Sequence, residues 1–176
     1  MINLTPVMQN FILHWGEMGV RWGINRTVAQ MHALLYLSPK PLTAEEISET
    51  LSIARSTVSS GLRELNSWGI IRIAHVLGDR RDHFEAISDV WEMARLLMDE
   101  RKRREIDPTL AVLRKSVTNL ESNNPDEAYV SDKLREMLEF LETIVFFYER
   151  IQKMSTKTII RAANLGENVF KLLGMV

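Results

Sequence analysis

One segment of the chain switches from helical to alternating hydrophobic spacing, and this switch restricts the possible folds more than any other feature. Thr43 and Glu46 form a capping-box pattern, which predicts the start of a short helix. Residues 52–54 separate it from a second helix that turns Val58, Leu62 and Leu65 inward. Gly69 ends this helix. The pattern indicates two short helices joined by a three-residue turn.

A hairpin is expected directly after the helix pair. Apolar residues alternate from residue 70 to 77, which predicts a strand rather than a helix. Residues 78–82, Gly-Asp-Arg-Arg-Asp, are typical of a turn, and residues 83–87 predict a returning strand. The order helix, turn, helix and basic-tipped hairpin predicts a winged helix-turn-helix.

Helical patterns flank this segment on both sides. They predict helices near residues 6–18, 25–37, 88–106, 107–120, 134–151 and 159–173. Asp107 and Pro108 form a cap-plus-proline start, which predicts a break or sharp kink there. The expected fold class is mainly α with a small antiparallel β-wing, with helices at both ends of the winged helix-turn-helix.

Composition and motifs argue against several classes of protein. The chain has no cysteine, which excludes disulfides and thiolate chemistry and fits a reducing cytoplasm. The start lacks the blocks of a signal peptide, and Glu142 interrupts the best apolar run, so we expect no membrane segment. The four histidines, His14, His32, His75 and His83, lack metal-ligand spacing, and no phosphate loop or nucleophile motif occurs. We expect no enzyme, cofactor or metal.

The second helix of the pair presents a face suited to DNA. With Val58 pointing inward, small hydroxyl side chains and Arg63 fall on the opposite side. Arg63 could hydrogen-bond a guanine, and the serines could hydrogen-bond phosphates or several bases. Arg55 is placed to contact the DNA backbone. Arg80 and Arg81 at the hairpin tip suit a minor groove, and we expect one neighbouring acid to orient an arginine. The predicted DNA-contacting residues are Arg55, Ser56, Thr57, Ser59, Ser60, Arg63, Ser67, Arg80 and Arg81.

These residues resemble a known family. Residues 42–47, 56–65 and 68–70 are similar to the MarR superfamily of winged-helix regulators. The wing Gly-Asp-Arg-Arg-Asp-His-Phe at 78–84 and the segment at 103–110 resemble its GbsR type, the regulators of glycine betaine synthesis. The resemblance implies a homodimer joined by N- and C-terminal helices, a recognition helix from Arg55 to Trp68, and Arg81 as the minor-groove arginine. Ala54 departs from it, because a serine or similar residue usually caps this helix.

The resemblance suggests how the chain is divided. We expect an N-terminal dimerisation helix (1–24), a DNA-binding region (25–88) and a C-terminal helical dimerisation region (89–176) within one compact domain. The expected dimer stripes are Leu138, Leu141 and Val145, and Val169, Phe170 and Leu173. A homodimer would place two recognition helices about one DNA turn apart, which predicts double-stranded DNA with an inverted repeat as the partner and repression as the default outcome.

Aromatic residues before the helix pair have two interpretations. Trp15, Trp22 and Tyr36 could line a pocket for a small effector of the betaine or choline type. Aromatic residues at helical spacing are also typical of a core or a dimer interface. Two other functions stay open: a winged-helix protein-interaction module without DNA binding, and a small-molecule-binding protein whose wing is vestigial.

Overall fold

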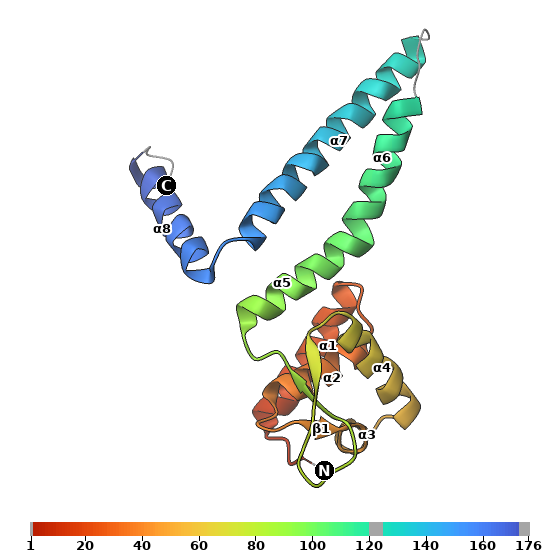
Figure 1. Cartoon of the computed structure of the whole chain (residues 1–176), viewed down its shortest axis with the longest axis vertical. Coiled ribbons are helices and arrows are strands. Elements are labelled where there is room, and N and C mark those ends of the chain that lie inside the picture. The colour runs from red at the N-terminus through yellow and green to blue at the C-terminus, as the bar shows by residue number, and fades with distance from the viewer. Residues whose placement is uncertain (1, 120–124, 173–176) are drawn as a thin grey trace. The chain divides into compact units, whose positions relative to one another are not determined.

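The computed structural model describes residues 2–119 and 125–172, with side chains from 2–119 and 128–165 (Figure 1). The elements that it contains are α1 (Pro6–Arg21), α2 (Arg26–Leu37), β1 (Leu42–Thr43), α3 (Ala44–Leu51), α4 (Arg55–Ser67), β2 (Ile71–Ala74), β3 (His83–Ala86), α5 (Val90–Arg101), the π-helical η1 (Lys102–Ile106), α6 (Asp107–Asn119), α7 (Pro125–Gln152) and α8 (Thr156–Leu172). The predicted fold class is confirmed. The chain divides into two compact units, Met1–Leu97 and Met98–Val176, each treated separately below.

Helix starts in the first unit follow the sequence closely. The Thr5 hydroxyl accepts a hydrogen bond from the Met8 backbone N–H at the start of α1. Thr43 and Glu46 form the predicted capping box of α3: the Thr43 hydroxyl accepts from the Glu46 N–H, and the Glu46 carboxylate accepts from the Thr43 N–H. Ala54 is the N-cap of α4 and provides no side-chain hydrogen bond, as its residue type predicts.

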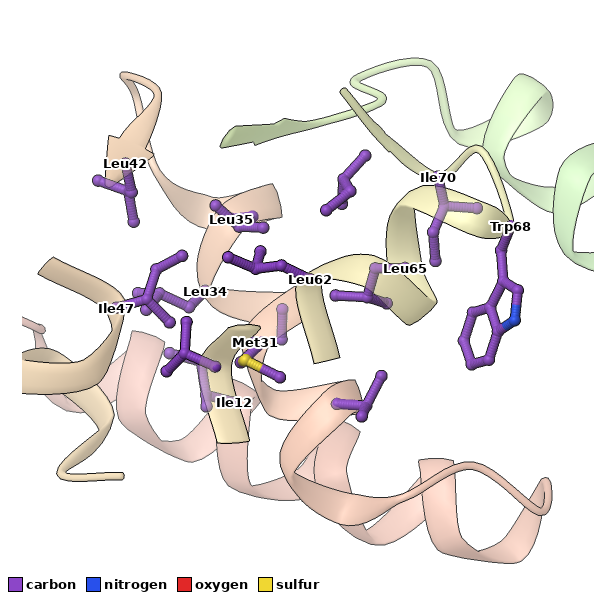
Figure 2. Close-up of a cluster of buried hydrophobic side chains, with 14 of the residues drawn as sticks. Ile12, Met31, Leu34, Leu35, Leu42, Ile47, Leu62, Leu65, Trp68 and Ile70 are labelled. Carbon is purple, nitrogen blue, oxygen red and sulfur yellow. The ribbon is translucent and has the colours of Figure 1, made fainter. Parts of the chain in front are cut away.

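The core of the first unit lies around α2, which packs against α1 and α4 (Figure 2). Met31 and Leu34 of α2 are fully buried, and Leu62 and Leu65 of α4 lie against them. Gly61 makes this approach possible, because a Cβ atom there would lie only 1.9 Å from the Met31 methyl carbon. The inward stripe of α4 therefore fixes which face of this helix remains exposed.

The wing has a strand that the hydrophobic pattern did not predict. The sheet is antiparallel with the order β1-β3-β2, so the returning strand β3 is central. Leu42 pairs with Phe84 and Thr43 with His83, while Ile73 pairs with Phe84 from the other side. Since β1 leads directly into α3, the pairing of β1 with β3 ties the first helix of the pair to the wing.

The helix does not break at Asp107 and Pro108, because it continues through η1 into α6, and the sharp kink that the sequence also allows stays a prediction. The Asp107 N–H donates to the Lys102 carbonyl five residues back, which is the π-helical pattern. Proline lacks an N–H and its ring crowds the preceding turn, so one wider turn accommodates Pro108 without ending the helix. The Lys102 ammonium also pairs with the Asp107 carboxylate at 2.7 Å.

In the second unit α6 packs against α7. Arg114 of α6 pairs with Glu142 of α7 at 2.8 Å, and Tyr148 donates a hydrogen bond to Asp99. The predicted stripe Leu138, Leu141 and Val145 is half-buried in the single chain. In the second predicted stripe, Leu173 lies outside the described residues, as do the side chains of Val169 and Phe170.

Candidate nucleic-acid interface

All nine residues predicted to contact DNA are exposed. Seven lie on α4, opposite the buried Val58, Leu62 and Leu65, and two lie in the turn between β2 and β3. Two hydroxyl groups already donate within α4: Ser60 to the Thr57 carbonyl at 3.0 Å and Ser67 to the Glu64 carbonyl at 2.7 Å. Their oxygens retain the capacity to accept further hydrogen bonds.

The wing holds Arg81 in a defined orientation. The Asp79 carboxylate accepts hydrogen bonds from the Arg81 backbone N–H at 3.0 Å and from its guanidinium Nη2 at 2.6 Å. These bonds hold the pKa of Asp79 far below its usual range, so this carboxylate is ionised at neutral pH. Gly78 allows the turn through its positive φ of 85°. The prediction that one acid orients a wing arginine is confirmed, with Asp79 as the acid and Arg81 as its partner.

A groove of about 590 Å³ joins the recognition helix to the wing. Arg55, Ser59 and Arg63 line it from α4, and Arg81 and Asp82 line it from the wing. The structure thus brings together four of the predicted residues that lie far apart in the sequence. The other five, Ser56, Thr57, Ser60, Ser67 and Arg80, are exposed but do not line this groove.

Glu45 is a further groove residue that sequence reasoning missed. Its carboxylate pairs with Arg55 of α4, and its second oxygen lies 3.6 Å from the Arg81 Nη1. Glu45 sits in the first turn of α3, where an acidic residue is favourable for the helix alone. This local role is enough to account for an acidic residue at position 45. The sequence pattern therefore gives no indication that Glu45 contacts two distant arginines.

The predicted effector residues surround a buried histidine. The Trp15 and Tyr36 rings each lie 6.4 Å from the His32 ring, centroid to centroid, and the Trp15 and Trp22 rings lie 5.5 Å apart. A cavity of about 150 Å³ is lined by Phe11, Trp15, His32, Ala33, Tyr36, Val90 and Met93. Trp22 instead lines a neighbouring space of about 20 Å³. The structure therefore brings Trp15 and Tyr36 to one cavity and places Trp22 beside it.

His32 gives this cavity an unusual polar group. It is 4% exposed, and its Nε2 atom makes no hydrogen bond in the described part of the protein. Burial lowers its pKa to about 4, so the imidazole is neutral at neutral pH. A neutral imidazole nitrogen can donate or accept one hydrogen bond, depending on the tautomer.

Neither a metal centre nor a membrane segment is found within residues 2–119 and 125–172. No three histidine or acidic side chains gather there as a metal site. No helix in these ranges combines the length and the apolar character needed to cross a bilayer.

Comparison with known proteins finds a matching family model and several similar chains. Residues 22–82 match the model of the MarR family. The chain is 24% identical over 139 residues to YvaV of Bacillus subtilis (strain 168), named as an HTH-type transcriptional regulator, and the match covers 76% of this chain and 78% of that protein. A crystal structure of a transcriptional regulator superposes with a TM-score of 0.65 at 19% identity, covering 84% of this chain and 96% of the other.

A looser likeness is to a mutant of Staphylococcus aureus MepR bound to an oligodeoxyribonucleotide, with a TM-score of 0.40 at 18% identity over 77% of this chain and 92% of that one. The segment matched by the family model runs from the end of α1 through the helix pair to the wing. Over this segment the chain is similar to the MarR family, and the fold that contains it is the winged helix-turn-helix of the solved transcriptional regulator.

Proposed function

We propose that the protein is a sequence-specific homodimeric repressor that binds an inverted-repeat operator in the cytoplasm. The observation that carries this proposal is the groove in which Arg55, Ser59 and Arg63 of α4 meet Arg81 of the wing. In a winged helix the recognition helix enters a major groove, and the wing reaches the adjacent backbone or minor groove. In this proposal the protein acts by binding DNA and is not an enzyme, in keeping with its similarity to the MarR family.

The groove residues have separate roles in this proposal. Arg63, near the middle of the exposed face of α4, reads a guanine through its two-pronged guanidinium. Arg55, in the first turn of α4, contacts a phosphate, and Arg81 enters the minor groove. Ser56, Thr57, Ser59, Ser60, Ser67 and Arg80 complete the proposed contact surface.

A second copy of the chain is the proposed partner in solution. Five large apolar side chains on α7 recur at alternating spacings of three and four residues and remain exposed in the single chain: Met137, Phe140, Ile144, Phe147 and Ile151. This is the spacing of a helix-packing seam. These residues lie beside the half-buried Leu138, Leu141 and Val145, so a second copy would cover a continuous apolar strip of α7.

The DNA proposal is tested by selecting bound duplexes from a random pool at two salt concentrations. We expect an inverted repeat to be enriched and the affinity to fall as salt rises. Arg81→Ala should weaken binding to all sequences, whereas Arg63→Ala should weaken discrimination at particular bases by about 1–3 kcal/mol. Arg26→Ala, on α2 and paired with Glu17, is the matched control and should change neither.

The outcomes separate the remaining functions. If no duplex is enriched with or without a candidate effector, the protein-interaction module becomes the better reading. Equal, sequence-independent losses from the Arg63 and Arg81 variants would contradict base reading by Arg63. A protein with a vestigial wing would instead bind its small ligand with no effect on any DNA affinity.

Control by a small effector is a second proposal, favoured by the cavity that His32 helps to line and by the lack of a hydrogen-bond partner for its Nε2 in the described structure. Its volume equals about five water molecules in the liquid, which suits a molecule of few heavy atoms. The Trp15 and Tyr36 rings offer faces to a quaternary ammonium group, while His32 can bond a hydroxyl or carboxylate. Choline and glycine betaine have this combination, and a regulator of the GbsR type would respond to them.

Tryptophan fluorescence tests the effector proposal, because Trp15 lines the cavity. Choline and glycine betaine are titrated beside 3,3-dimethylbutan-1-ol, a neutral analogue of choline with the same shape. We expect choline to bind more tightly than the neutral analogue, and Trp15→Leu to abolish that difference. Trp91→Leu, at an exposed position of α5, is the control. Equal binding of choline and the neutral analogue would exclude recognition of the cationic charge.

A further inference from the structure

Glu45 occupies the place in the groove where an anionic DNA backbone would otherwise meet two cations. Its carboxylate pairs with Arg55 at the start of α4, and it lies 3.6 Å from Arg81 in the wing. All three side chains line the same groove. One carboxylate of the protein therefore binds both of the arginines that we assign to the DNA backbone and the minor groove.

These ion pairs contribute little to the stability of the fold. The side chains of Arg55, Arg81 and Glu45 are 73%, 59% and 42% exposed. Ion pairs between exposed side chains contribute between zero and about 1 kcal/mol, because water and salt screen them. Arg81 also has Asp79 as a second acidic partner, so it does not need Glu45 for its orientation. The contacts of Glu45 are thus dispensable for folding and for the shape of the wing.

The ion pairs of Glu45 should affect DNA binding more than they affect folding. A phosphate that approaches Arg55 or Arg81 must compete with the Glu45 carboxylate for the same guanidinium donors. Arbitrary DNA and the operator both make these backbone contacts, so the competition lowers both affinities by a similar factor. Operator DNA also gains base contacts from α4, which Glu45 does not touch. The base contacts keep the operator bound at protein concentrations at which arbitrary DNA is released.

We propose that Glu45 is an internal competitor for phosphate: it holds Arg55 and Arg81 in the free protein and lowers the affinity for DNA of any sequence. This inference rests on the DNA-binding face proposed above. Glu45 lies on α3 and makes no favourable contact with DNA in this proposal, yet its substitution should change the affinity for DNA.

The test is Glu45→Gln, which keeps the size of the side chain and removes its charge. Affinities for the selected operator and for a scrambled duplex of equal length are measured over a series of salt concentrations. We expect binding to both duplexes to tighten about tenfold and the salt dependence to steepen by about one unit. Glu92→Gln, an equal charge change in the first turn of α5, is the control and should alter neither affinity.

A double-mutant cycle identifies the route of the effect. If Glu45 acts by occupying the arginines, its substitution should have little effect once Arg55 and Arg81 are both alanine. An undiminished gain in that background would mean general repulsion of DNA and would overturn the competition. Weaker or unchanged operator and scrambled binding by Glu45→Gln would also overturn it. Failure of the wild-type protein to bind any duplex would instead contradict the proposed function.

Discussion

Acidification should destabilise this protein through one buried histidine. Burial lowers the pKa of His32 from 6.5 to about 4, whereas in the unfolded chain His32 has its ordinary pKa. As pH falls from 6.5 towards 4, the unfolded state binds a proton that the folded state does not. The stabilisation from neutral His32 is therefore complete above pH 6.5 and is lost as pH falls towards 4.

The size of the effect follows from the difference between the two pKa values. Each unit of difference corresponds to 1.36 kcal/mol. Between pH 8 and pH 5 the free energy of unfolding should fall by about 2 kcal/mol, before most carboxylates begin to protonate. Urea unfolding at a fixed protein concentration measures this free energy, with intrinsic tryptophan fluorescence as the probe.

His32→Phe isolates this residue from other titrating groups. The His32 Nε2 has no hydrogen-bond partner in the described structure and a cavity adjoins the ring, so we expect the variant to be no less stable at pH 8. Its stability should lack the 2 kcal/mol decline. His14→Gln, at an exposed position of α1, should retain the decline. The same decline in wild type and His32→Phe would refute the reasoning.

Further predictions concern packing, capping and assembly. A Cβ on Gly19 would lie 2.5 Å from the Ala29 Cβ, so Gly19→Ala should cost about 1–3 kcal/mol in urea unfolding, and Ala29→Gly in the same chain should restore part of it. If Ala29→Gly restores none of the lost stability, a direct clash between the two side chains is contradicted. Thr43→Ala removes half of the capping box and should cost about 1 kcal/mol in the same assay, and no loss would show that solvent replaces the cap. Replacing exposed Phe140 and Phe147 by glutamate should convert the proposed dimer to monomer in analytical ultracentrifugation, and an intact dimer would move the interface elsewhere.

Local signals in the sequence identified the helix pair and its exposed face correctly. The capping box of Thr43 and Glu46 and the inward spacing of Val58, Leu62 and Leu65 are determined by residues within one or two turns of each other. These predictions agree with the structure because the buried stripe fixes the rotation of α4 about its own axis. The exposure of Arg63 and the serines then follows from the same rotation.

The parts that sequence did not predict depend on contacts between separate elements. The strand β1 has only two residues, so it has no period to detect, and its pairing partner Phe84 lies more than forty residues away. Asp107 and Pro108 carry a local signal for a break, but a single π-helical turn absorbs the proline. The cavity at His32 needs three helices to form, and no one of them predicts it.

The electrostatics of the groove connect these observations. Its lining residues include three arginines, Arg55, Arg63 and Arg81, against Glu45 and Asp82, a balance of +1. The whole chain has a net charge of −1. Long-range attraction to DNA is therefore weak, and electrostatic steering contributes little to association. Discrimination between operator and other DNA must then come from short-range contacts that lengthen the lifetime of the complex. A carboxylate that holds two arginines in the free protein weakens the backbone contacts that all DNA shares and leaves unchanged the base contacts, on which discrimination depends.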